Sequence, residues 1–232
     1  MRQLRHFTLF FILLITQSAQ AEQLFGQWNT VNITGFFGNS NWFYNLEESE
    51  RNSNDVKGHF GLAQVTSYEG IGYQFNEHHS VLAGFWYQYT QPPYSGQYVS
   101  EADAYQRYTY TTKTPLGKLS LRTQLEERNN ISQPNANGSS VRYRQQAKLV
   151  YPITNTNWSA VINEEVFVNL NSVNWGPTSG FDQNRIFVGA GYDFNKVWRT
   201  EFGYMNQYVD RNLNEDFIDN QLSLSLYINI PR

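Results

Sequence analysis

The chain has 232 residues, with six Trp, sixteen Tyr and sixteen Phe, no Cys and a formal net charge of −3. The absence of Cys excludes a disulfide framework and a thiolate metal site, and the acidic balance argues against a nucleic-acid partner. Aromatic residues make up 16% of the chain, which is too many for a disordered protein. A single domain that buries or otherwise accommodates these rings is therefore expected.

The N-terminus has the three parts of a secretory signal peptide. Arg2 and Arg5 precede an apolar stretch at 7–15, and the A-x-A pattern Ala19-Gln20-Ala21 follows. This order predicts a signal peptide over 1–21, cleaved after Ala21, and a mature domain over 22–232. The apolar stretch is too short for a transmembrane helix, which needs roughly 20 residues.

From residue 24 onward, apolar and polar residues alternate with a period of two, and short clusters of Asn, Gly, Pro, Ser or Thr interrupt the alternation. This pattern predicts β-strands. In 117–130, for example, Leu119, Leu121 and Leu125 share one face, while Arg122 and Glu126 share the other. Eleven such runs are expected, at 24–34, 41–50, 57–75, 80–90, 101–113, 118–129, 140–152, 158–171, 181–194, 197–209 and 217–230.

These runs are about twice as long as the strands of a soluble sandwich, and they match the roughly 9–11 residues of a strand that crosses a bilayer. The sequence therefore predicts an all-β fold, an antiparallel transmembrane β-barrel whose apolar faces meet lipid. Bacterial barrels have an even number of strands, so 10–12 strands are expected rather than eleven. Residues 22–35 form either a wall strand or a plug. The alternative is a soluble periplasmic β-protein with a wet cavity.

The connections predict how the barrel is oriented. Tight turns at 76–79, 114–118, 154–157 and 195–196 alternate with longer loops at 90–101, 129–139, 171–181 and 210–217. Short turns belong on the periplasmic side, and aromatic residues beside them suit an interfacial girdle. These aromatic residues are Tyr73, Phe75, Tyr151, Trp158, Tyr192, Phe194 and Trp198.

Two carboxylates conflict with the alternation. Glu69 and Glu164 fall on faces that the pattern turns toward lipid, where a charge is costly. A β-bulge moves side chains from one face to the other. Bulges near 67–70 and beside Asn163 are therefore expected.

Five motifs occur in order along the predicted strands. They are Leu125-Glu126-Glu127-Arg128, Arg142-Tyr143-Arg144, Asn163-Glu164-Glu165-Val166-Phe167, the run 184–192 (NRIFVGAGY) and Glu201-Phe202-Gly203-Tyr204. Through these motifs the chain resembles a family of Gram-negative outer-membrane barrels, the domain of unknown function 2490, over roughly 28–230.

The resemblance implies an outer-membrane location. For a barrel in that location, the expected partners are outer-membrane lipid, lipopolysaccharide, the barrel-assembly machinery and small solutes. The resemblance carries no activity, catalytic residue or cofactor. The chain departs from barrels of this kind at its end, Ile230-Pro231-Arg232, where an aromatic residue is usual. This departure displaces the insertion signal, with Tyr227 as the candidate.

The charged faces of the strands predict a network that lines the lumen. Its members are Arg122, Glu126, Arg128, Arg142, Arg144, Lys148, Glu165, Arg185, Arg199 and Glu201. One interpretation is a selectivity lining for anionic solutes. The other is a set of structural salt bridges that fills a small barrel, and the narrow lumen favours it.

The leading functional hypothesis is a small passive or selective pore for small solutes. One alternative is a closed barrel with a structural or surface-interaction role. Another is an outer-rim lipid hydrolase that uses His59, but no Ser is placed beside this His by the sequence, and a hydrolase needs such a pair. We therefore expect no enzymatic activity, no metal and no cofactor.

Overall fold

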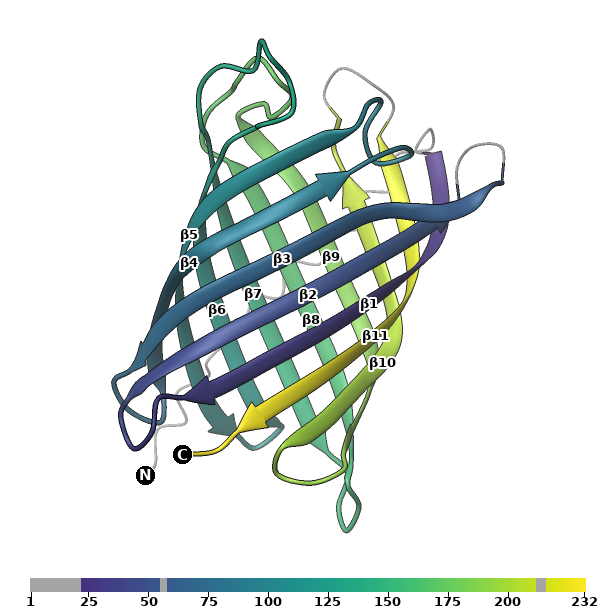
Figure 1. Cartoon of the computed structure of the whole chain (residues 1–232). Coiled ribbons are helices and arrows are strands. Elements are labelled where there is room, and N and C mark those ends of the chain that lie inside the picture. The colour runs from purple at the N-terminus through teal and green to yellow at the C-terminus, as the bar shows by residue number, and fades with distance from the viewer. Residues whose placement is uncertain (1–21, 55–57, 212–215) are drawn as a thin grey trace, which may run out of the picture.

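The computed structural model describes residues 22–54, 58–211 and 216–232. These residues form one closed β-barrel (Figure 1). The signal peptide predicted over 1–21 lies outside the described residues. No helix within the described ranges is long and apolar enough to cross a membrane.

Eleven strands make up the described wall, and each overlaps one of the eleven predicted runs. Their bounds are β1 Glu22–Phe36, β2 Trp42–Asn54, β3 Phe60–Gln74, β4 His79–Thr90, β5 Val99–Thr114, β6 Gly117–Arg128, β7 Ser140–Pro152, β8 Trp158–Asn169, β9 Gly180–Asp193, β10 Trp198–Val209 and β11 Phe217–Ile230. Each strand pairs with its sequence neighbours, and β1 closes the barrel against β11.

The predicted even strand count is wrong. β1 pairs in antiparallel register with β2 and in parallel register with β11, from Glu22 opposite Phe217 to Gly35 opposite Ile230. Figure 1 shows both arrowheads at the same end of the barrel. A closed meander of eleven strands has its first and last strands running in the same direction, so one parallel pair is unavoidable. Residues 22–36 therefore form a wall strand and not a plug.

Short and long connections alternate around the barrel, as predicted. We call the end with 37–41, 75–78, 115–116, 153–157 and 194–197 the short-turn end. The opposite end carries the loops 91–98, 129–139 and 170–179, and we call it the long-loop end. The loops after β6 and β8 project beyond the wall at this end (Figure 1).

The two faces of the wall have opposite polarity. Apolar side chains on the outer face are exposed, among them Phe85 (74%), Leu222 (71%) and Val188 (55%). Glu126, Gln124 and many other polar side chains are buried inside. The period-two alternation of the sequence produces this arrangement, because successive side chains of a strand point to opposite faces.

Both predicted bulges are in the wrong place. The pairing of β2 with β3 shifts at Arg51/Asn52, which leaves Ala63 as the extra residue. The pairing of β8 with β9 shifts at Phe167/Val168, which leaves Asp182 as the extra residue. The ladders pass the predicted positions without interruption, so Glu69 and Glu164 stay on the outer face. A carboxylate alone therefore does not force a bulge.

Candidate functional site

The interior of the barrel holds a continuous charged network. Arg144 contacts both Glu126 (2.6 Å) and Glu165 (2.8 Å). Glu126 also binds Arg142 (2.7 Å), and Glu165 also binds Arg122 (2.7 Å). These five predicted residues therefore lie together. Each carboxylate is shared by two guanidinium groups, and such sharing compensates buried charge on both sides.

Of the other predicted lumen residues, four form ion pairs outside this network. Lys148 and Arg199 both bind Glu201, at 2.6 and 3.0 Å, nearer the short-turn end. Arg128 binds Glu101 at the long-loop end, with a shortest distance of 2.7 Å. Among the described residues, no carboxylate lies within 4.0 Å of the Arg185 guanidinium, whose Nη2 donates to Gln183 at 3.2 Å.

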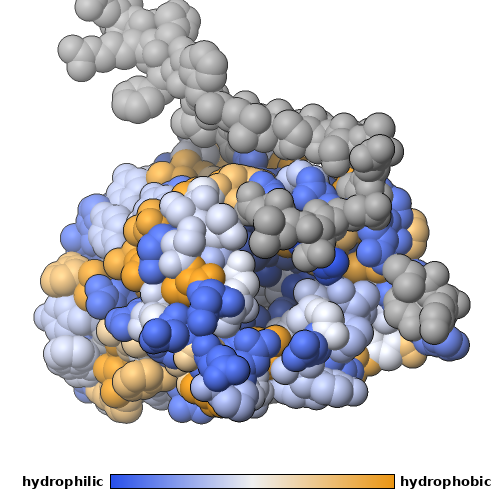
Figure 2. All heavy atoms as spheres, turned by 90° about the horizontal axis from the view of Figure 1, so that it is seen from above, coloured by the Kyte–Doolittle hydropathy of each residue, from blue (hydrophilic) through white to orange (hydrophobic). Residues whose placement is uncertain are grey.

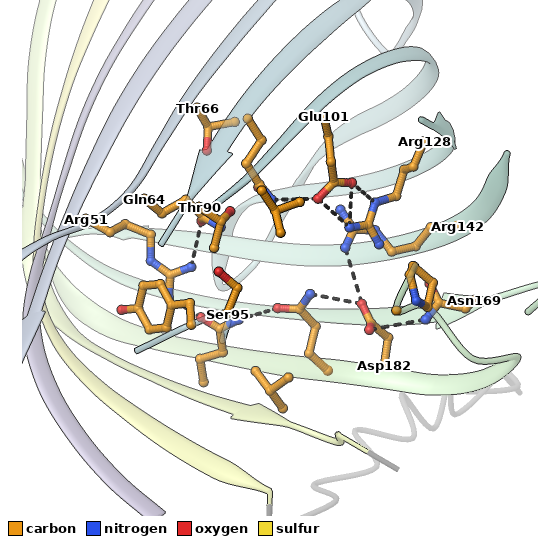
Figure 3. Close-up of a pocket in the computed structure, with 18 of the residues that line it drawn as sticks. Arg51, Gln64, Thr66, Thr90, Ser95, Glu101, Arg128, Arg142, Asn169 and Asp182 are labelled. Atoms are coloured by element: carbon orange, nitrogen blue, oxygen red, sulfur yellow. Dashed lines mark hydrogen bonds and ion pairs between the residues drawn. The ribbon is translucent and has the colours of Figure 1, made fainter. Parts of the chain in front are cut away.

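An outer chamber of about 380 Å³ opens at the long-loop end. Figure 2 shows a hollow between hydrophilic side chains at this end. Figure 3 shows how charged side chains from opposite walls converge in the chamber. Asp182, which the bulge turns inward, accepts hydrogen bonds from Arg142 (3.3 Å) and Asn169 (3.2 Å). The bulge in β9 therefore supplies one of the chamber's carboxylates.

The loop 91–98 folds inward over this chamber. Its Gln91 N–H donates to the carbonyl of the bulged Ala63 (2.9 Å), so the bulge in β3 anchors the loop. The Tyr94 hydroxyl donates to Asp219 and accepts from Gln221 Nε2 at 2.6 Å. Arg211 donates to the carbonyl of Pro93 at 2.9 Å. The loop is thus held to β3 and β11 and to the segment after β10.

The loops 129–139 and 170–179 hold each other. The Asn174 Oδ1 atom accepts a hydrogen bond from the backbone N–H of Asn137 at 2.9 Å. Its Nδ2 atom donates to the carbonyl of Asn135 at the same distance. The Trp175 indole donates to the carbonyl of Gly138 at 3.0 Å. Trp175 also lines the outer chamber, with its ring 5.6 Å from the Arg128 guanidinium. These contacts make the two loops one ordered lobe at the chamber mouth.

An inner chamber of about 420 Å³ occupies the other half of the barrel. It extends to Phe43 and Ser80, each the second residue of its strand at the short-turn end. Its lining contains both hydroxyl or amide side chains and basic side chains. The chamber volumes fall within the range of small-molecule pockets, about 300–1,000 Å³.

Four residues line both chambers, and we call them the septum: Trp28, Glu47, Arg144 and Arg185. These four side chains therefore lie where the two chambers adjoin. The septum comes from β1, β2, β7 and β9. It therefore crosses the barrel and does not line one wall.

Rings and guanidinium groups alternate through the septum. Arg51 lies 4.4 Å from the Tyr94 ring and 4.3 Å from the Trp28 ring. Arg185 follows, 4.7 Å from Trp28 and 4.5 Å from Phe167. Arg144 ends the series, 4.5 Å from Phe167. We call this series the arginine–aromatic ladder. Cation–π contacts are strongest where water is excluded, as at these buried positions.

An apolar cluster lies beside the ladder inside the barrel. Tyr68 stacks on Trp86 at 5.2 Å and meets Tyr105 edge-on at 5.4 Å. The Tyr68 hydroxyl accepts a hydrogen bond from Arg144 at 2.9 Å. Gly70 leaves room for this cluster, because a Cβ there would lie 2.7 Å from the Tyr105 hydroxyl. The septum is therefore packed from the side of β3 to β5.

The sequence analysis did not single out four of the six members of the ladder. Trp28, Arg51, Tyr94 and Phe167 were not expected at the centre, because the aromatic residues were assigned mainly to the outer face. The alternation could have placed Phe167 inside the barrel, because it shares the inward face of its strand with Glu165. Arg51 lies one residue beyond the predicted run 41–50, so a longer run would have included it.

His59 lies exposed in the connection between β2 and β3. Across 22–54, 58–211 and 216–232, no group of three or more His, Cys, Asp and Glu side chains is arranged to hold a metal ion.

The fold and interior define a closed β-barrel with two polar chambers. The chain belongs to the family described as protein of unknown function (DUF2490), whose model matches residues 25–217. It is 32% identical over 114 residues to an uncharacterized protein of Methylorubrum extorquens. The aligned part covers 48% of either chain, so the chain spans about half the length of this curated relative. No solved structure matches the chain.

Proposed function

We propose that the protein is an integral outer-membrane β-barrel of a Gram-negative cell. One observation carries this proposal: exposed apolar side chains cover the outer wall of β4 to β11, while charged side chains are buried inside. A water-soluble barrel buries its apolar face. In a bilayer the order is reversed, because closure satisfies every backbone group and lipid receives the apolar face.

Aromatic residues at the short-turn end support the proposal. Trp158 packs against Tyr192 at 4.7 Å, and Trp42 packs against Tyr73 at 5.1 Å. Trp42 and Trp158 are 52% and 41% exposed, respectively. Exposed rings gathered at one end of a barrel suit the membrane–water interface, where one edge of a ring is apolar and the other is wet.

We infer further that the barrel is closed at rest. The septum and the apolar cluster occupy the lumen between the two chambers. A freely open passive pore has no place for this layer. The interior then serves to bind small molecules or to support the outer lobe, which suits a surface-interaction role better than free conduction.

A selective pore is the second candidate, and the position of two guanidinium groups favours it. Arg144 and Arg185 line both chambers, so a displacement of either side chain would join them. Solutes would then meet a path lined by guanidinium groups, which favours anions.

Reconstitution in planar bilayers tests both candidates. Correctly folded barrel, identified by its heat-modifiable shift on unboiled gels, is expected to insert and to give no conductance steps. The septum variant Trp28→Ala is expected to give steps, because it removes the ring between Arg51 and Arg185. Anion-selective steps from the wild type would favour the pore. A protein that stays monomeric in water without detergent would overturn the membrane proposal.

A further inference from the structure

We propose that the inner chamber is a binding site for a small hydroxylated organic anion, recognised through Arg185 and Arg107. The proposal goes beyond the proposed function, because binding requires neither conduction nor a particular membrane. It rests on the charge balance of the chamber, on unpaired donors in its wall and on the uncharged polar groups of its lining.

The lining carries more positive than negative charge. Five basic side chains line the inner chamber, with two carboxylates. The basic residues are Arg107, Arg122, Arg144, Lys148 and Arg185, and the carboxylates are Glu47 and Glu165. A buried excess of one sign calls for a counter-charge. An anion in the chamber would supply it.

Three of the five cations are already compensated. Arg122 and Arg144 bind Glu165, at 2.7 and 2.8 Å, and Lys148 binds Glu201 at 2.6 Å. The compensated cations are thus structural.

Arg107 and Arg185 differ from them. Within the described ranges, neither guanidinium has a carboxylate within 4.0 Å, and each donates only to an amide oxygen. Arg107 donates to Gln124 (2.7 Å), and Arg185 donates to Gln183 (3.2 Å). Among the described residues of the lining, these two guanidinium groups are the ones without a carboxylate contact, so they are the candidates for binding a ligand.

Buried donors in the chamber wall lack acceptors. The Nε atoms of Arg122 and Arg185 and the indole Nε1 of Trp28 are buried without a hydrogen-bond partner among the described residues. Buried donors are nearly always paired in native proteins. The side chains that carry them line the chamber, so small movements would turn these N–H groups toward an oxyanion.

The rest of the lining specifies the remainder of the ligand. Thr109, Ser120, Ser223, Ser225 and Asn163 present hydroxyl and amide groups to the chamber. Such uncharged groups both donate and accept, as the hydroxyl groups of a sugar-like molecule do. The volume of about 420 Å³ suits one small molecule, such as a sugar acid or a sugar phosphate.

Calorimetric titration of the folded protein in detergent micelles tests this site. Glucose 6-phosphate is the probe. Glucose, which lacks the anion, and inorganic phosphate, which lacks the sugar, are the controls. We expect glucose 6-phosphate to bind at least tenfold more tightly than either control. Quenching of Trp fluorescence should accompany binding, because Trp28 lies against Arg185.

Variants assign the site within the barrel. Arg185→Gln and Arg107→Gln are each expected to weaken binding of glucose 6-phosphate at least tenfold. Arg211→Gln removes an Arg that lines only the outer chamber, so it is expected to leave binding unchanged. If Arg185→Gln does not fold, as judged by the heat-modifiable shift, Arg107→Gln decides.

Four results would overturn the proposal, and the first three concern glucose 6-phosphate, glucose and the Arg107 variant. These three are no binding of glucose 6-phosphate to folded protein, equal binding of glucose, and wild-type affinity in Arg107→Gln. Equal binding of inorganic phosphate would reduce the site to a simple anion site and would also overturn it. Because the heat-modifiable shift and lipid insertion are scored separately, failure of this proposal is distinct from failure of the membrane proposal.

Discussion

The Arg185 guanidinium lies 4.7 Å from the centre of the Trp28 ring, although β11 and β10 separate their strands along the wall. The contact therefore runs across the lumen and not along the sheet. It joins the first strand to the ninth, and with Phe167 and Arg144 it divides the interior into two chambers.

Phe167→Ala tests the ladder. The Phe167 side chain is fully buried between Arg185 and Arg144, and removing a buried Phe costs about 3–5 kcal/mol. We expect a lower denaturant midpoint in micelles, and conductance steps where the wild type has none. Val168→Ala, on the outward face of the same strand, is the control, and its denaturant midpoint should fall much less. Equal losses in both variants would contradict a special role for the ladder.

Glu126→Gln tests the charged network. Glu126 is fully buried and binds Arg142 and Arg144 at 2.7 and 2.6 Å. Breaking a buried ion pair from one side costs about 3–5 kcal/mol, because the remaining charges stay buried. The expected result is a large drop in the unfolding midpoint. The adjacent Glu127 is exposed on the other face, so Glu127→Gln should change little. A stable Glu126→Gln variant would show that water already solvates these guanidinium groups.

Val188→Arg tests whether lipid covers the outer wall. Val188 is 55% exposed in the middle of β9, where a bilayer would impose about 2–4 kcal/mol on an Arg. In water the same substitution would be close to neutral. We expect reduced folding yield and stability in lipid vesicles. Ile131→Arg, at a 59% exposed position in the long loop after β6, is the control and should fold normally.

The attachment of loop 91–98 to β11 through the Tyr94 hydroxyl is predicted to weaken at alkaline pH. Burial raises the pKa of Tyr94 well above its ordinary value, and the adjacent Asp219 acts in the same direction. The stability that depends on the protonated hydroxyl is therefore fully present below about pH 10, the ordinary Tyr pKa. It is lost as the pH rises beyond that value. Unfolding midpoints between pH 7 and 11 should fall further for the wild type than for Tyr94→Phe. Parallel curves would contradict this assignment.

The positions of the strands could be predicted from the sequence. The alternation in 117–130 and in the other runs depends only on backbone geometry, since side chains i and i+2 share a face. For the same reason, the lumen-facing phase of Arg144 and Glu165 could be read without neighbouring strands. The lengths of the connections likewise separated the two ends of the barrel.

Only the tertiary structure decided how the barrel closes and what divides it. A run of alternating residues does not specify its partner, so the parallel pairing of β1 with β11 and the bulges at Ala63 and Asp182 emerged only from closure. The contact of Arg185 with Trp28 depends on barrel diameter and on the shear between strands. Both are properties of the closed sheet and not of any single strand.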